Sequence, residues 1–277
     1  MQNLHAFWMN LPAHVHPVAF TLGSLEIRWY SLMYMTAILV CYVTFVRQCR
    51  AKGLTRFVQV APDLLSYAIL GILLGARLGY ALFYDGVYFL AHPLELFWPF
   101  HEGHFTGISG LSYHGGAIGF LLAMYLVTRQ YKIPFRPFFN ELVTVIPLGY
   151  TFGRLGNFLN QELYGRATSS WLGMRFPTDQ QHLVRYPSQL FEAVGEGLLL
   201  YFFLQWLVRQ PRWSSYVTPA YMIGYGLIRF IIEFTRQPDP FQALLFGIFS
   251  YGQLLCGIMV ALGLFLIPWF GSASRKG

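Results

Sequence analysis

Seven apolar stretches, each about 20 residues long, constrain this chain more than any other feature, because a helix needs about 20 apolar residues to cross a bilayer core. They cover roughly residues 27–46, 63–84, 110–128, 138–158, 188–208, 217–235 and 249–270. The pattern predicts an all-α polytopic membrane protein with seven transmembrane helices. We expect residues 1–277 to form a single integral membrane domain, in which residues 1–25 are loop-like.

The composition agrees with a membrane protein and argues against other classes. Hydrophobic residues make up 55% of the chain and charged residues only 11%, whereas soluble domains carry about 25% charge. The net charge of +7 would suggest nucleic acid as the partner of a soluble protein. Here the basic residues gather in particular loops, which indicates lipid contact and no nucleic acid. Cys41, Cys49 and Cys256 lie far apart, so we expect no disulfide, no metal site and no cofactor.

The basic residues also predict an orientation. The loops after the first, third and fifth stretches, together with the tail, hold eleven lysines and arginines, and the alternate loops hold four. Because positive loops stay in the cytoplasm, the N-terminus is expected outside the cell and the C-terminus in the cytoplasm.

The segment from Gly149 to Arg166 turns polar at the end of the fourth stretch. Its letters are GYTFGRLGNFLNQELYGR. Arg154 and Asn157 are three residues apart, so a helix places them on one face. An arginine buried in a membrane is costly, and its presence beside several glycines indicates a functional site.

Other polar side chains fall at the same predicted depth, in the outer half of the membrane. They are Tyr30, Arg77, His114, Gln189, Glu192, Glu196, Tyr225, Arg229 and Glu233. The inner halves of the stretches are almost purely apolar. This distribution predicts one polar cavity that opens toward the outer leaflet.

Three arginines (77, 154 and 229) and three carboxylates (192, 196 and 233) share this depth. One interpretation is structural ion pairing between helices. The other is anion binding, because arginine suits bidentate contact with phosphate and no lysine occurs in the seven stretches. A phosphate-bearing lipid headgroup would then be the ligand.

His114 is the only histidine within the seven stretches, and Gly115 and Gly116 follow it. The glycines could let the backbone approach an anionic ligand, and the histidine could act as a general base. The equally weighted alternative is a histidine hydrogen-bonded at a helix interface, with glycines that serve helix packing.

Several motifs together resemble a known family. They read GRLGNFLNQELYGR, SYHGG, RYPSQLFE and IGYGLIRFIIEFTRQPD. The chain resembles the bacterial prolipoprotein diacylglyceryl transferases over roughly residues 18–260. The resemblance implies seven helices in the bacterial inner membrane, an active site facing the outer leaflet, and two substrates, phosphatidylglycerol and a prolipoprotein signal peptide with a lipobox cysteine. It implies transfer of diacylglyceryl to that thiol with release of glycerol 1-phosphate.

The resemblance also marks individual residues. It implies catalytic roles for His114, Arg154 and Arg229, and phosphatidylglycerol binding by Arg154, Asn157, Tyr30, Tyr225, Glu233, Glu162 and Gly165. One position departs from the family pattern, since Asn140 stands where an aspartate is common. Any structural role of that carboxylate is expected to have moved to Glu141.

Two other classes of function remain open on the sequence. A phospholipid transporter or flippase would use arginines for the headgroup but should carry polar groups through both leaflets and an internal repeat, which this chain lacks. A non-catalytic membrane scaffold would not need histidine, arginine and asparagine at one depth.

Overall fold

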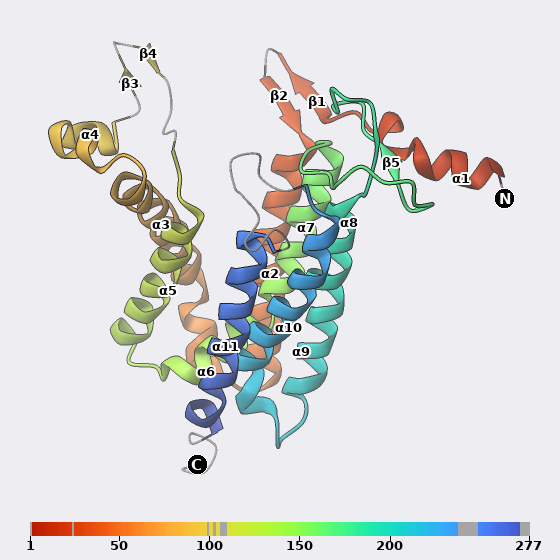
Figure 1. The fold of residues 1–277 in the computed structure, drawn as a ribbon. Helices are drawn as coiled ribbons and strands as arrows, with labels where there is room; N and C mark the ends of the chain where they lie inside the picture. Colours follow the sequence, from red (N-terminus) through yellow and green to blue (C-terminus); the bar gives the residue numbers. More distant parts are fainter. Residues whose placement is uncertain are drawn as a thin grey trace. The chain divides into compact units, whose positions relative to one another are not determined.

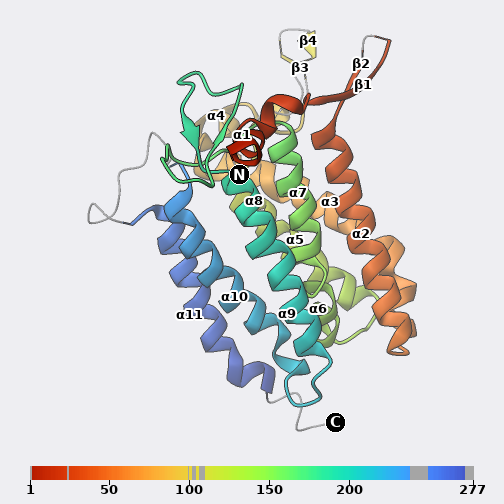
Figure 2. The same ribbon diagram turned by 90° about the vertical axis from the view of Figure 1, so that its right-hand side faces the viewer.

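The computed structural model describes residues 2–23, 25–98, 100–101, 104–105, 110–237 and 249–271. Most of these residues are helical (Figures 1 and 2). The α-helices are α1 (Gln2–Met9), α2 (Trp29–Ala51), α3 (Thr55–Phe83), α4 (Gly86–Ala91), α5 (Tyr113–Gln130), α6 (Phe135–Val143), α7 (Ile146–Leu159), α8 (Ser188–Glu192), α9 (Leu200–Val208), α10 (Val217–Ile232) and α11 (Tyr251–Gly271).

Shorter elements connect these helices. The 3₁₀ turns are η1 (Leu11–His14), η2 (Pro93–Leu96), η4 (Ser214–Tyr216) and η5 (Glu233–Thr235), and η3 (Ala193–Leu199) is a π-helix. Three antiparallel hairpins pair β1 (Val18–Leu22) with β2 (Leu25–Arg28), β3 (Phe100–His101) with β4 (His104–Phe105), and β5 (Met174–Arg175) with β6 (Val184–Arg185).

Five helical segments are long and apolar enough to cross a membrane. They cover Trp29–Ala51, Thr55–Phe83, Ser188–Val208, Ser214–Thr235 and Tyr251–Phe270. Their large side chains are widely exposed, for example Leu70 at 58% and Phe265 at 78%, as expected of surfaces that contact lipid chains. The protein is therefore a helical, multi-pass membrane protein.

The fourth apolar stretch does not form the continuous helix expected over residues 138–158. It divides into α6 and α7, with a turn at residues 144–145. Pro147 lies in the first turn of α7. Its ring has no N–H to donate and would clash with the carbonyl four residues earlier, which kinks or breaks a helix at that point. α7 thus begins anew and carries the polar residues at its other end.

The chain forms two compact units. The first contains residues 1–45 and 140–277 and the second contains residues 46–139. In the first unit α7, α9, α10 and α11 run side by side (Figures 1 and 2). Leu200, Leu204, Leu207 and Val217 form a buried apolar core between α9 and α10.

Residues before α2 were expected to be loop-like, and this expectation is wrong. They form α1, η1 and the β1–β2 hairpin, and they pack on the loop between α7 and α8. Trp8 Nε1 donates to the Leu172 carbonyl at 3.1 Å, and Gln161 Nε2 donates to the carbonyls of Pro12 and Val15 at 3.1 and 2.8 Å. Together these segments cap one end of the bundle.

A buried ion pair holds the loop of this cap. The Arg185 guanidinium donates to both carboxylate oxygens of Asp179 at 2.7 and 3.0 Å and stacks on the Tyr164 ring. Asp179 also accepts from the amides of Gln181 and Leu183. The hydrogen bonds from Arg185, followed by those from the amides, lower the pKa of Asp179 to about 2, against burial, which raises it.

In the second unit α3 packs along α5 through small residues. A Cβ added to Gly75 would lie 2.4 Å from the Gly115 carbonyl, and one added to Gly119 would lie 2.0 Å from the Gly71 carbonyl. Neither approach is possible for a residue with a side chain, so these glycines permit the close contact typical of membrane helix pairs.

Candidate functional site

The polar end of α7 continues into a tight loop that is tied together by side chains. Arg154 Nη1 donates to Asn157 Oδ1 at 3.2 Å, and Asn157 Nδ2 donates to Glu162 Oε1 at 2.7 Å. Asn160 Nδ2 donates to the other Glu162 oxygen at 2.8 Å. These bonds make Asn157 the link between the arginine on the helix and the carboxylate in the loop.

The loop keeps its shape through unusual backbone angles and contacts with α8. Gln161 and Leu163 have φ values of 57° and 59°, which few non-glycine residues adopt. Gln189 Nε2 donates to the Glu162 carbonyl at 2.6 Å, and Ser188 Oγ donates to the Leu163 carbonyl at 3.0 Å. The two side chains of α8 thus fix the strained turn that presents Glu162.

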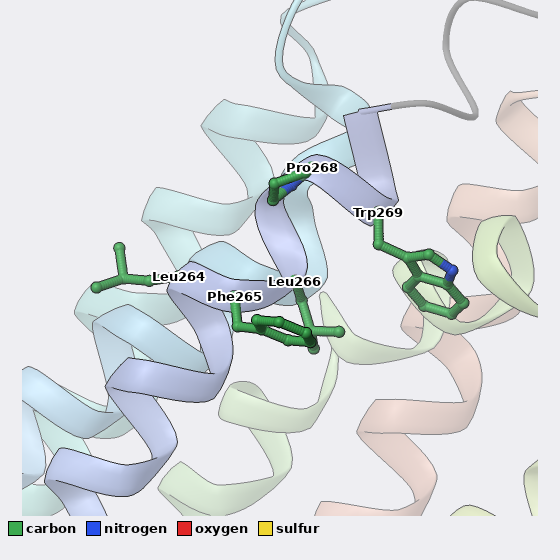
Figure 3. A pocket seen from close by; sticks show the side chains of 5 residues that line it. All are labelled: Leu264, Phe265, Leu266, Pro268 and Trp269. Carbon is green, nitrogen blue, oxygen red and sulfur yellow. The ribbon is translucent and has the colours of Figure 1, made fainter.

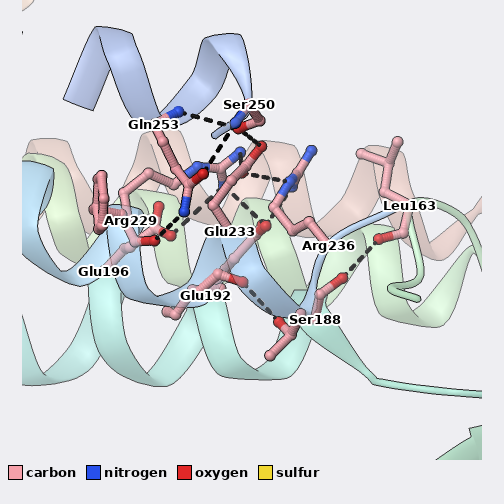
Figure 4. A network of polar contacts seen from close by, with 12 residues as sticks. Leu163, Ser188, Glu192, Glu196, Arg229, Glu233, Arg236, Ser250 and Gln253 are labelled. Atoms are coloured by element: carbon pink, nitrogen blue, oxygen red, sulfur yellow. Dashed lines mark hydrogen bonds and ion pairs between the residues drawn. The ribbon is translucent and has the colours of Figure 1, made fainter. Parts of the chain in front are cut away.

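Glu192 is the centre of the ionic network (Figure 4). Its side chain is 1% exposed. Glu192 Oε1 accepts a hydrogen bond from Arg229 Nη1 at 2.9 Å, and Glu192 Oε2 forms an ion pair with Arg154 Nε at 2.7 Å. Arg236 also pairs with the same carboxylate. One carboxylate at the end of α8 therefore gathers arginines from α7, from α10 and from the residue after η5.

Two further carboxylates balance the charge of this network. Arg229 Nη2 lies 3.2 Å from Glu233 Oε2, and Arg236 Nε lies 3.2 Å from the same oxygen. Glu196 Oε1 lies 3.6 Å from Arg229 Nη1. Three arginines thus face three carboxylates. Charges can be buried in a membrane protein only when they are paired in this way.

Aromatic side chains support the two arginines that face each other across Glu192. The Arg154 guanidinium lies over the Tyr150 ring at 4.7 Å. The Tyr150 and Tyr225 rings meet edge to face with centroids 5.9 Å apart. Each tyrosine precedes an arginine by four residues on its own helix, so the sequence repeats one arrangement on α7 and α10.

The end of α10 is held from two sides. Ser250 Oγ donates to Glu233 Oε1 at 3.0 Å, and Gln253 Oε1 accepts from the Ser250 amide (Figure 4). On the other side the Arg166 amide donates to the Thr235 carbonyl at 2.8 Å. The loop after α7 and the start of α11 therefore fix the position of Glu233.

Gly165 allows the loop to approach the end of α10. A Cβ at this position would lie 2.2 Å from the Thr235 carbonyl and 3.0 Å from the Tyr186 side chain. Tyr30 on α2 lies against the polar end of α7, because a Cβ at Gly156 would lie 3.4 Å from its ring. Both predicted residues thus lie beside the network. Among the described residues, the Tyr30 hydroxyl makes no hydrogen bond to the network.

The structure brings together most of the residues that the sequence singled out. They are Tyr30, Arg154, Asn157, Glu162, Gly165, Tyr225, Arg229 and Glu233, all in the first unit. His114 and Arg77 belong to the second unit and are described separately.

His114 is exposed and lies at the second residue of α5. Ser112 caps this helix by accepting from the Gly115 amide at 3.3 Å. Gly115 packs against Gly75 and Gly79 of α3, so the structure gives this glycine the packing role that the sequence left open.

Arg77 binds backbone carbonyl groups of its own unit. It is 7% exposed and donates to the backbone carbonyls of Glu95, Leu96 and Gly110. Its guanidinium also lies 4.8 Å from the centre of the Phe89 ring. It thereby anchors the segment that follows α4.

Asn140 fills the position where the family pattern has an aspartate. Its Oδ1 accepts from the Thr218 amide and hydroxyl, at 3.1 and 2.5 Å, and its Nδ2 donates to the Ser215 carbonyl at 3.0 Å. The asparagine ties α6 to the start of α10 itself.

Three members of the network were missed by sequence reasoning: Tyr150, Arg236 and Ser250. Tyr150 has the (i, i+4) spacing to Arg154 that would have indicated a shared helix face. Arg236 lies one residue beyond the sixth apolar stretch, so the sequence placed it in a loop and not in the membrane site. No sequence signal pointed to Ser250.

In the parts of the chain that the structure describes, no three His, Cys, Asp or Glu side chains form a group able to hold a metal ion. An apolar hollow lies beside Leu264, Leu266 and Trp269 on α11 (Figure 3). No polar side chain lines it, so it resembles a surface covered by lipid chains.

Comparison with known proteins gives a consistent result. The family model described as prolipoprotein diacylglyceryl transferase matches residues 17–269. A phosphatidylglycerol–prolipoprotein diacylglyceryl transferase from Chlorobaculum tepidum is 40% identical over 97% of this chain and 94% of its own. Proteins with the same name from Acinetobacter baylyi and Bordetella avium are 42% and 43% identical, over 93% and 90% of this chain and 92% of their own. The chain therefore belongs to the prolipoprotein diacylglyceryl transferase family.

Proposed function

We propose that this chain transfers the diacylglyceryl group of phosphatidylglycerol to the lipobox cysteine of a prolipoprotein. The thiol sulfur attacks the glyceryl carbon that carries the phosphate ester. A carbon–sulfur bond forms, the carbon–oxygen bond breaks, and its electron pair leaves with the phosphate. The products are a thioether-linked lipid and glycerol 1-phosphate, and the thiol proton passes to a base.

The observation that carries this proposal is the arginine cluster around Glu192. The leaving phosphate gathers negative charge as the carbon–oxygen bond breaks, and fixed guanidinium groups stabilise that charge. Arg154 and Arg229 both touch Glu192, so their planes are held before any ligand binds. Arginine also offers the planar two-bond contact that phosphate favours.

The other predicted residues receive binding roles in this proposal. Asn157 and Tyr225 orient the glycerol of the headgroup by hydrogen bonds. Glu162 holds Asn157 in place through the bond at 2.7 Å. Glu233 orients Arg229, and Gly165 permits the loop contact that fixes Glu233. Tyr30 completes the wall beside α7.

We also propose that seven segments cross the bacterial inner membrane, with the N-terminus outside and the C-terminus in the cytoplasm. Five crossings are the five apolar helices. We assign the sixth crossing to α5, and the seventh to α6 and α7 together. The unequal distribution of basic residues among the loops supports the direction. The lipid site would then face the outer leaflet.

His114 is proposed as the base that takes the thiol proton. An unperturbed cysteine has a pKa of about 8.5, so little thiolate exists near neutrality, and an imidazole can accept the proton during attack. His114→Gln should fold and bind phosphatidylglycerol but transfer lipid slowly, with partial recovery at higher pH. Rate–pH profiles that coincide for the two proteins would exclude this role.

The whole proposal is tested by mass spectrometry of a lipobox peptide. Membranes that contain the protein should add one diacylglyceryl group to the peptide and release glycerol 1-phosphate from phosphatidylglycerol. A matched peptide with serine in place of cysteine should remain unmodified. An unmodified cysteine peptide, under conditions where the protein is intact, would refute the proposed activity.

A further inference from the structure

Glu196 contacts two different partners, the hydroxyl of Tyr150 and the guanidinium of Arg229. Tyr150 Oη donates to Glu196 Oε2 at 2.6 Å, while Glu196 Oε1 lies 3.6 Å from Arg229 Nη1. We propose that Tyr150 and Glu196 are positioning residues that keep the Arg229 guanidinium available to the phosphate of the lipid substrate. The proposal rests on the transferase function described above.

The distances indicate which contact Glu196 favours. A charge-assisted N–H···O bond usually measures about 2.7–2.9 Å, and 3.6 Å is too long for a hydrogen bond. Glu196 is 0% exposed, so water does not compete for its oxygens at the surface. The tyrosine hydroxyl is therefore the hydrogen-bond partner of this carboxylate, and Arg229 faces it as an ion-pair partner at a distance longer than a hydrogen bond.

The backbone that carries Glu196 is fixed, so the side chain is the part that can turn. Glu196 belongs to the π-helix η3. A Cβ at Gly197 would lie 2.1 Å from Thr151 Oγ1, which leaves no space between η3 and α7. Thr151 also donates to the Ala193 carbonyl at 3.4 Å. Without the Tyr150 hydroxyl, Glu196 Oε2 loses its hydrogen bond, and rotation of the carboxylate toward Arg229, already 3.6 Å from the other oxygen, would replace it.

The Tyr150 ring and the Tyr150 hydroxyl have separable roles. The ring supports Arg154 and contacts Tyr225, and phenylalanine would keep both contacts. The hydroxyl donates to Glu196 and also interacts with Arg154. Tyr150→Phe removes the hydroxyl while the ring still supports Arg154, and the added Glu196→Gln substitution isolates the contribution of Glu196.

The expected effect of Tyr150→Phe is weaker lipid binding. Glu196 should close onto Arg229 and compete with the phosphate, so KM for phosphatidylglycerol should rise at least 10-fold while kcat changes less than 3-fold. Replacing Glu196 by glutamine in the same protein should restore KM, because a neutral amide does not compete for the guanidinium. A purely structural role would make Tyr150→Phe/Glu196→Gln no better than Tyr150→Phe.

The experiment measures transfer to a lipobox peptide and, separately, displacement of a fluorescent phosphatidylglycerol from the purified protein in lipid nanodiscs. The displacement measurement tests the role of Tyr150 even if the wild-type protein transfers no lipid. Absence of transfer by the wild-type protein would refute the proposed function and not this inference. Tyr201→Phe is the matched control, because no hydrogen bond of its hydroxyl is recorded among the described residues, and it should match the wild type in both arms.

Three results would overturn the proposal. They are unchanged KM and binding in Tyr150→Phe, a fall in kcat at unchanged KM, and failure of Glu196→Gln to restore the double variant. If Tyr150→Phe does not fold, Glu196→Gln alone decides the question. It should bind fluorescent phosphatidylglycerol at least as tightly as the wild type, and weaker binding would contradict the inference.

Discussion

Replacing Arg154 by lysine keeps the positive charge and removes the planar fork. In the structure the guanidinium makes two polar contacts at once, from Nε to Glu192 at 2.7 Å and from Nη1 to Asn157 at 3.2 Å. A single ammonium cannot reproduce this geometry together with a contact to phosphate. Loss of one charge-assisted hydrogen bond costs about 1.5–3 kcal/mol, which corresponds to a roughly 10- to 150-fold lower kcat/KM.

The assay is the rate of diacylglyceryl transfer to a lipobox peptide at several phosphatidylglycerol concentrations. Arg28→Lys is the matched control. Arg28 pairs with Glu26 at 3.6 Å and its side chain is 54% exposed, and exposed ion pairs contribute little. This control should keep wild-type kinetics. If Arg154→Lys also keeps kcat/KM within 3-fold of the wild type, a forked contact by Arg154 in the transition state is refuted.

Three further predictions concern topology and stability. Cysteines placed near Arg175 should react with an impermeant thiol reagent in intact cells and those near Lys132 should not, in a background without native cysteines; the reverse pattern would overturn the orientation. Asn140→Ala should lower the unfolding temperature, because the buried amide and hydroxyl of Thr218 lose their acceptor, which costs about 1–3 kcal/mol of folding free energy. KM should stay unchanged. The pKa of Asp179 is lowered from 3.8 to about 2, a stabilisation of about 2 kcal/mol that is present above pH 4 and lost as the pH falls toward 2. The difference in unfolding temperature between wild type and Asp179→Asn should therefore shrink across that range, and a constant difference would contradict the assignment.

Five of the seven apolar stretches form helices long and apolar enough to cross a membrane, and the sequence could predict these because hydropathy depends only on local composition. It also predicted which side chains meet. Arg229 and Glu233 have (i, i+4) spacing, and the structure places them 3.2 Å apart. The shared depth of polar residues on different stretches was sufficient to group Arg154, Glu192 and Arg229, because antiparallel helices return to the same membrane face.

Features that depend on tertiary packing were not predictable in the same way. The break between α6 and α7 has a local cause in Pro147, but proline also occurs inside α3 and α11 without ending them, so the residue type alone did not decide. The cap built from α1 and the β5–β6 hairpin depends on contacts between residues more than 140 positions apart, such as Gln161 with Pro12. No local pattern carries that information.

The choice between ion pairing and phosphate binding also could not be made from the sequence, because both uses require the same residues. An arginine buried near a membrane needs a counterion whether or not it binds a ligand, and Glu192 provides one for Arg154, Arg229 and Arg236 together. Glu196 and Glu233 complete the pairing, so three carboxylates balance the three arginines. In the proposed function, guanidinium N–H groups that these contacts do not use would donate to the phosphate, and no guanidinium is unpaired before the lipid binds. Under the proposed function, pairing in the free protein and phosphate binding in the reaction are two states of one network, and the strength of the carboxylate contacts would set how readily the network exchanges one anion for the other.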